Sequence, residues 1–162
     1  MEKSGQSFHS RPMQKNEPRS ISYAGTFDRS MDAKNRVTVP AAWLNGGPDE
    51  FHAIPSPSGD CLMVMPPEEF NAWENRFRES PASRDEQRKA IRQFYSRARS
   101  VSVDSQGRIL LPEEQCEALA LNGEIVMVGG RSRFEIWNPK RWAAVSSEEA
   151  GVYNQVAEMI GL

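Results

Sequence analysis

The stretch MDAKNRVTVP, from Met31 to Pro40, joins a charged turn to a short apolar run that ends at a proline. Seventy-two positions later the chain reads VDSQGRILLP, from Val103 to Pro112, with aspartate, arginine and proline at the same places. One chance match of this kind is easy to find, but a long stretch in register is not. The doubled decamer therefore predicts two copies of one structural unit.

The rest of the chain supports this repeat, because the two copies stay in register without a gap over nearly fifty residues. We assign the copies to residues 21–77 and 93–148. Matched positions include Tyr23 with Tyr95, Ile54 with Val126, Leu62 with Phe134, Val64 with Ile136, Pro67 with Pro139, and Phe70 with Trp142.

Each copy has the same order of strand signals. RVTVP and RILLP are short apolar runs that stop at a proline, as strands do when the next residue cannot donate a ladder hydrogen bond. Two further strands follow in each copy, FHAI and CLMVM around PSPSGD, and EIVMV and FEIW around GGRSR. The turn residues between them predict β-hairpins.

Helix signals complete each copy and make the expected class α+β. PEEQCEALALNG has glutamates in its first turn and a stop at Asn122-Gly123, and PPEEFNAWENRF and NPKRWAAV close the two copies. Phe70, Trp73 and Phe77 recur at helical spacing, a stripe that favours core packing over contact with a cofactor.

The segments outside the copies predict three further regions. Residues 1–20 are expected to be a disordered extension, 78–92 a basic helical connector with an apolar face, and 149–162 an amphipathic tail. The tail carries apolar residues at helical spacing and almost no charge. Such a segment needs a groove on its own domain or on a neighbouring subunit.

Composition excludes several classes of protein. The chain has 162 residues, 38% hydrophobic and 26% charged, with no apolar run of membrane-spanning length and no signal-peptide core, so we expect a cytoplasmic location. Cys61 and Cys116 are expected to be buried thiols. With His9 and His52 the only histidines, a metal site or a histidine-based catalytic set is disfavoured, and no cofactor or small-molecule substrate is expected.

Charge is segregated along the chain although the net charge is only −2. Residues 42–75 contain six acidic residues and no basic one, whereas 76–99 contain eight basic residues and three acidic ones. This pattern is typical of a protein with one surface facing an anion. The basic face of the connector could either be solvated or contact phosphate directly.

The Asp-x-x-x-Arg motif has the composition of a tight connection between strands. Asn35 and Gly107 precede the two arginines and tolerate positive φ at the tip of a turn. Asp32 and Asp104 can accept hydrogen bonds from the backbone of the turn or pair with the arginine. These four residues are therefore expected to shape the loops.

Two interpretations of the arginines stay open from the pattern alone. Either each arginine closes a salt bridge to its own aspartate and the motif is only a turn, or Lys34, Arg36, Gln106 and Arg108 project toward an anion. The presence of two copies favours the second, because paired loops with arginine and glutamine suit a DNA groove, where arginine pairs with guanine and glutamine with adenine.

The stretches SMDAKNRVTVPAAW, VSVDSQGRILLP and VMVGGRSRFEIWNPKRW resemble the MraZ family of bacterial regulators over about residues 21–148. The resemblance implies two tandem SpoVT/AbrB-type swapped-hairpin units that form one intramolecular pseudo-twofold β-barrel flanked by short helices. It also implies a nucleoid-associated ring homo-oligomer that binds direct repeats in the promoter of the division and cell-wall gene cluster, usually as a repressor. The loops Asp32 to Arg36 and Asp104 to Arg108 would contact the DNA.

The sequence departs from the family pattern in three places. Asn35 stands where the family usually has glycine, the second loop has no lysine to match Lys34, and a 20-residue extension precedes the first copy. Loop one is therefore expected to carry more of the DNA affinity. The alternative function is an antitoxin-like or scaffold barrel that binds a protein and not specific DNA; an enzyme is disfavoured because no catalytic motif is present.

Overall fold

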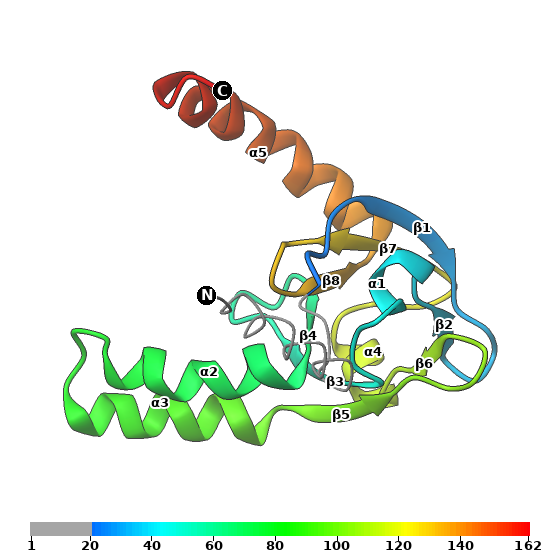
Figure 1. The fold of residues 1–162 in the computed structure, drawn as a ribbon, viewed down its shortest axis with the longest axis horizontal. Coiled ribbons are helices and arrows are strands. Elements are labelled where there is room, and N and C mark those ends of the chain that lie inside the picture. Colours follow the sequence, from blue (N-terminus) through cyan, green and yellow to red (C-terminus); the bar gives the residue numbers. More distant parts are fainter. Residues whose placement is uncertain (1–20) are drawn as a thin grey trace, which may run out of the picture.

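The structure is a computed structural model that describes residues 21–162, so the predicted N-terminal extension lies outside the described residues. Figure 1 shows antiparallel sheets from which a hairpin of two helices and one long helix project in different directions. The elements are β1 (Thr26–Ser30), β2 (Arg36–Thr38), α1 (Ala41–Leu44), β3 (Glu50–Pro55), β4 (Leu62–Met65), α2 (Pro67–Arg78), α3 (Arg84–Ser96), β5 (Arg99–Ser102), β6 (Arg108–Leu110), α4 (Glu113–Ala118), β7 (Glu124–Gly129), β8 (Phe134–Trp137) and α5 (Pro139–Met159). The predicted α+β class is confirmed.

The larger sheet joins the two halves of the chain by exchanging strands between them. Its order is β1-β7-β8-β4-β3-β5, with every neighbouring pair antiparallel. The two predicted hairpins, β3-β4 and β7-β8, are present and lie side by side at the centre. The first strand of each half pairs with the hairpin of the other half, β1 with β7 and β5 with β3.

The smaller sheet is a ribbon made of β2 and β6, the strands predicted from RVTVP and RILLP. The two strands are antiparallel, with Val37 opposite Ile109 at the centre. Both of these side chains are buried, so the ribbon packs on the core by one face and presents the other to solvent. This pairing also crosses between the halves of the chain.

The main-chain pairing of the described residues does not form a closed barrel. β1 and β5 are the two edges of the larger sheet, and the ribbon is a separate sheet. The helices are also not all short, because α5 runs for 21 residues. The family resemblance implied a closed barrel flanked by short helices. The described residues instead form two open sheets, and one of the helices is long.

The main core lies between the two sheets and is rich in aromatic rings. Tyr23, Trp43, Phe51 and Phe134 are almost fully buried and contact one another, with Trp43 and Phe134 ring centroids 4.8 Å apart. Burial of each such side chain is worth about 1.5–3 kcal/mol. The Trp43 indole N–H also donates to the Ala24 carbonyl oxygen at 3.1 Å, so its polar atom is satisfied.

A second core lies under the hairpin of helices α2 and α3. The predicted stripe of Phe70, Trp73 and Phe77 packs here, with ring centroids 5.9, 6.0 and 5.5 Å from that of Phe94. The Tyr95 hydroxyl donates to the Phe70 carbonyl oxygen at 2.9 Å and ties α3 to α2. The interpretation of this stripe as core packing is confirmed.

Two helices differ in extent from what the sequence indicates. α4 ends at Ala118, four residues before the expected stop, and Ala120 then takes a φ of 55° while its carbonyl oxygen accepts a hydrogen bond from Asn138. α5 begins at the predicted Asn138 cap but continues through the expected break at residue 148. Its second half projects away from the sheets in Figure 1.

Alanine substitutions at Gly129 and Gly151 should change stability in opposite directions. A Cβ atom at Gly129 would lie 2.5 Å from the Tyr23 carbonyl oxygen and 2.7 Å from the Ala24 Cα, so Gly129→Ala should lower the free energy of unfolding by about 1–3 kcal/mol. Gly151 has nothing within 4 Å, so Gly151→Ala should increase helicity and add up to about 1 kcal/mol to helix stability. Urea unfolding and circular dichroism measure both, and equal effects would contradict the close approach at Gly129.

Candidate nucleic-acid interface

Loop one, residues 32–36, is held by a single carboxylate. Asp32 Oδ1 accepts hydrogen bonds from the backbone N–H groups of Lys34 and Arg36 at 2.9 and 2.8 Å. Its Oδ2 accepts from Arg36 Nε at 2.7 Å. Asn35, at the tip, has a φ of 63°, which asparagine tolerates better than most residues.

Loop two, residues 104–108, repeats this geometry. Asp104 Oδ1 accepts from the backbone N–H groups of Gln106 and Arg108, both at 2.9 Å, and Oδ2 accepts from Arg108 Nε at 3.0 Å. Gly107 takes the tip position with a φ of 78°. The loop shape thus survives the change from glycine to asparagine between the two copies.

The hydrogen bonds keep both carboxylates charged. The backbone N–H of Arg36 lowers the pKa of Asp32 below its ordinary value, with further lowering by the Arg36 side chain and the Lys34 N–H, while desolvation opposes it. Arg108 and Gln106 lower the pKa of Asp104 in the same way. Because the loops are exposed, the ion pairs themselves add little stability, and their main effect is to fix the geometry.

Each arginine uses only part of its guanidinium group on the loop. Arg36 and Arg108 bind their aspartates through Nε, and the described residues provide no hydrogen-bond acceptor for their Nη groups. The two side chains are 34% and 26% exposed. Each arginine therefore closes the turn through Nε, as the first alternative expects, and its Nη donors have no acceptor among the described residues.

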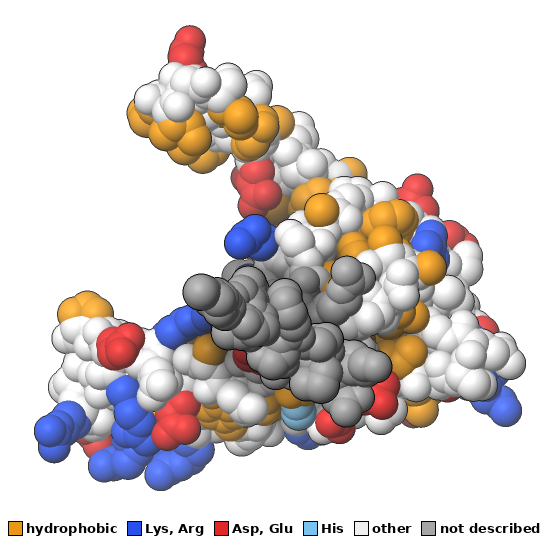
Figure 2. Space-filling model, in the orientation of Figure 1, with side chains coloured by type: hydrophobic (Ala, Val, Ile, Leu, Met, Phe, Trp, Pro, Cys, Tyr) orange, Lys and Arg blue, Asp and Glu red, His pale blue; other side chains and the backbone are white. Residues whose placement is uncertain are grey.

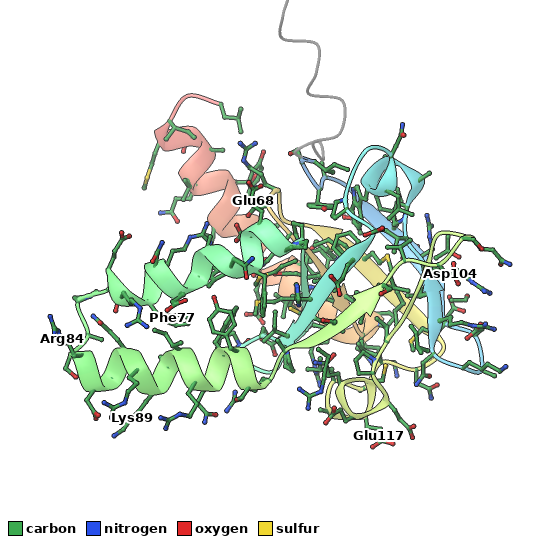
Figure 3. All side chains as sticks on the ribbon, turned by 60° about the horizontal axis from the view of Figure 1, so that its bottom comes forward. Glu68, Phe77, Arg84, Lys89, Asp104 and Glu117 are labelled. Atoms are coloured by element: carbon green, nitrogen blue, oxygen red, sulfur yellow. The ribbon has the colours of Figure 1, made fainter. Side chains whose placement is uncertain are left out.

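The ribbon sets the distance between the two arginines. Arg36 lies opposite Leu110, and Arg108 lies opposite Thr38, so the arginines are two residues apart along the ribbon, or about 7 Å. Both loops lie at one end of the molecule, at the right in Figure 1. In Figure 3, the labelled Asp104 of loop two lies far from Arg84 and Lys89 on α3.

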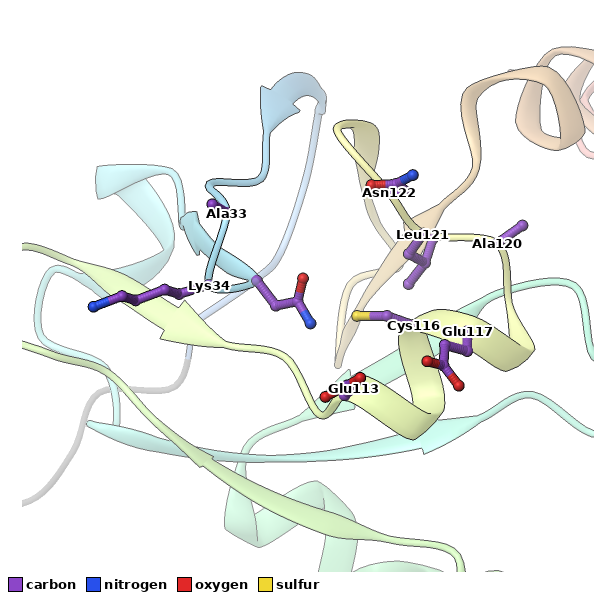
Figure 4. A pocket seen from close by; sticks show the side chains of 9 residues that line it. Ala33, Lys34, Glu113, Cys116, Glu117, Ala120, Leu121 and Asn122 are labelled. Carbon is purple, nitrogen blue, oxygen red and sulfur yellow. The ribbon is translucent and has the colours of Figure 1, made fainter.

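Lys34 adds a positive charge beside loop one. It is exposed and borders a hollow of about 510 Å³ that Glu113, Glu117 and Cys116 also line. Figure 4 shows its side chain extending away from both glutamates. Burial raises the pKa of the Cys116 thiol to about 11, so this thiol is protonated at neutral pH and is a poor nucleophile.

Arg29 is a cation near the ribbon that the sequence did not reveal. Its Nε donates to the Thr38 carbonyl oxygen at 3.3 Å, which places it on the loop-two end of the ribbon, where Thr38 pairs with Arg108. The other repeat has valine at the matching position, Val101, so the comparison of copies gives no signal. Arg29 reaches the ribbon because β1, the strand that carries it, is fixed in place by its pairing with β7.

Part of the positive charge of the basic segment 76–99 is paired with nearby carboxylates. Arg76 pairs with Glu69 at 2.9 Å and Arg78 with Glu74 at 2.8 Å, while Arg88 and Lys89 both contact Asp85. Figure 2 shows positive and negative side chains interspersed over the helix hairpin. These pairs favour the solvated interpretation of this face over direct phosphate contact.

The remaining candidates for chemistry are buried or packed. Cys61 and Cys116 are free buried thiols, as predicted, and the His52 ring stacks on Phe70 at 4.0 Å. Within residues 21–162 no cluster of three metal-ligating side chains occurs. None of the helices in that range is both long enough and apolar enough to cross a bilayer.

The loop carboxylates predict a pH dependence of stability. A carboxyl group whose pKa is lower in the folded protein than in the unfolded chain stabilises the fold. This stabilisation is fully present above the pKa of the unfolded chain, about 3.9, and is lost as the pH falls through the pKa of the folded protein. Asp32→Asn combined with Asp104→Asn should therefore lose less stability than the wild type on acidification from pH 5 to pH 2. Urea unfolding across this range measures the difference, and parallel curves for the two proteins would contradict it.

Sequence comparisons identify the family of this chain. A family model described as "MraZ protein, putative antitoxin-like" matches residues 94–162. Proteins named "Transcriptional regulator MraZ" match over most of the chain. Those from Desulforamulus reducens and Symbiobacterium thermophilum are 35% and 36% identical, over 85% of this chain and 96% and 99% of their own lengths. One from Heliobacterium modesticaldum is 34% identical over 85% of this chain and 96% of its own length. The chain belongs to the MraZ family.

Proposed function

We propose that this protein is a sequence-specific DNA-binding transcriptional regulator that represses the bacterial division and cell-wall gene cluster from direct repeats in its promoter. The observation that carries the proposal is the ribbon, which presents two arginines on aspartate-held loops at one end of the molecule. Relatives that match most of the chain are named transcriptional regulators. The proposal assigns the protein to the nucleoid and gives it no catalytic step.

The dimensions of the ribbon support major-groove binding. The major groove of B-DNA is about 12 Å wide and accepts a two-stranded β-ribbon. The spacing of about 7 Å between Arg36 and Arg108 along the strands corresponds to about two base-pair steps of 3.4 Å. The Nη donors of each arginine are available for guanine, with Lys34 on phosphate and Gln106 on adenine or phosphate.

We further propose that residues 21–77 and 93–148 are two swapped-hairpin units of SpoVT/AbrB type. The exchange of β1 and β5 between the two halves supports this assignment. The ribbon is then the place where the two units meet, and the pseudo-twofold axis runs between Val37 and Ile109. One chain would present both loops to the same groove.

A single subunit has too few cations for strong binding, which points to a ring of subunits. Each cation bound to a DNA phosphate contributes a salt slope of about −0.9, and non-specific dissociation constants are roughly 10⁻⁴ to 10⁻⁶ M. Linking several subunits raises avidity by about 10² to 10⁴. The projecting half of α5 supports assembly, because it exposes Val152, Tyr153, Val156, Met159 and Ile160.

Removing both loop arginines tests DNA binding. Arg36→Ala combined with Arg108→Ala should weaken binding to a promoter fragment at least tenfold. The salt slope should fall by about 0.9 for each phosphate that an arginine no longer neutralises. Fluorescence anisotropy at several salt concentrations measures both quantities. Arg78→Ala is the control, because Arg78 is likewise paired with a carboxylate four residues earlier in the chain but lies on α2, away from the loops.

An unchanged affinity and slope in the double variant would mean that the motif is only a turn. The alternative function, an antitoxin-like or scaffold barrel, would then be favoured, and the exposed face of α5 would be its binding surface. Capture of one defined protein by the wild type, abolished in an α5 variant, would support that alternative.

The apolar stripe of α5 should control assembly. Val156→Glu combined with Ile160→Glu places two charges on the stripe, so sedimentation velocity should show smaller particles than the wild type at equal concentration. Asn154→Glu adds one negative charge on another face of the helix and should leave the particle size unchanged. If the wild type and both variants sediment as monomers, the ring is wrong.

A further inference from the structure

The outer face of the ribbon carries an exposed leucine. Because Val37 and Ile109 point into the core, the neighbours Thr38 and Leu110 point outward, on the same face as the two arginines. Leu110 is 57% exposed, and within residues 21–162 every other large apolar side chain of comparable exposure belongs to the end of α5 or to the residues after it. Its position on a charged face needs an explanation.

The register places Leu110 directly beside Arg36. Val39 N–H donates to the Gly107 carbonyl oxygen and Leu111 N–H to the Asn35 carbonyl oxygen, both at 2.9 Å. In an antiparallel ladder the positions between such bonds are the non-hydrogen-bonded pairs, whose Cβ atoms lie about 4.5–5.5 Å apart. Arg36 with Leu110 and Arg108 with Thr38 are therefore the two closest side-chain pairs of the ribbon.

The surroundings of Leu110 fit a ligand that is anionic but carries an apolar group. Leu110 borders a hollow of about 400 Å³ that is also lined by Lys34, by Glu113 and by Arg99, whose Nε is paired with Glu114 at 2.9 Å. Arg36 adds donors on the other side. In the major groove of DNA the C5-methyl group of thymine is the apolar feature among polar base edges and phosphates.

We propose that Leu110 reads the C5-methyl group of a thymine next to the guanine that Arg36 binds. The assignment rests on the proposed DNA-binding function. Thr38 is the equivalent residue of the other repeat, 72 positions earlier, and it offers one methyl group beside Arg108. The two halves of the ribbon thus read unequal base steps, so a chain built from two similar units recognises a directional site.

Deoxyuridine tests the assignment, since it lacks only the C5-methyl group and pairs as thymine does. Anisotropy titrations would compare a footprinted promoter fragment with copies in which the thymines of each repeat are replaced one position at a time. At one position the wild type should lose about fourfold in affinity per repeat, the size expected for one buried methyl group. Leu110→Ala should lose a similar factor on thymine DNA and show no further loss on deoxyuridine DNA.

Leu110→Met keeps an apolar side chain and should keep the discrimination between thymine and deoxyuridine. Thermal unfolding of each variant checks that the exposed substitution leaves the fold intact. Equal affinity of the wild type for every substituted fragment overturns the thymine assignment, while the proposed function stands as long as the arginine variant still loses binding. Discrimination that persists in Leu110→Ala also overturns it. If the wild type binds no fragment at all, the proposed function fails as well.

Discussion

The hydrogen bonds that join β1 to β7 and β5 to β3 are the interactions on which the other features of the structure depend. Each pair links one half of the chain to the other, so neither half can complete its sheet alone. The ribbon of β2 and β6 forms by the same kind of pairing. The relative position of the two loops is consequently a property of the whole fold, and a change that separates the halves would also separate the arginines.

The loop aspartates connect local structure to the proposed function. Asp32 and Asp104 satisfy two backbone N–H groups each and also hold the Nε atom of an arginine. A planar guanidinium group fixed at one edge loses less conformational entropy when its other edge binds a base. In the proposed function the turn and the DNA site are therefore the same loop, and a contact that adds little stability on the surface would aid recognition by holding the arginine donors in place.

Local signals in the sequence predict local structure well. Six of the eight strands, both hairpins, the cap of α5 and the partly buried stripe of α2 follow from residue patterns, and Asn35 has the positive φ expected from its place before Arg36. The other two strands, β1 and β5, were not predicted. The repeat does not say which strand pairs with which, because pairing between distant segments depends on the complete core. For that reason the sequence did not reveal that Arg29 lies beside the ribbon. The sequence analysis also placed a boundary at residue 148, whereas α5 continues through this position without a glycine or proline there.

The direction of the proposed DNA site constrains how subunits assemble. Direct repeats require subunits that face the same way along the duplex, whereas a twofold contact between subunits would turn every second ribbon around. In the proposed assembly the contact between subunits is therefore heterologous, with the exposed apolar residues of α5 bound to a different surface of the next subunit. α5 projects from the body away from the ribbon end, so such a contact leaves the loops open to DNA.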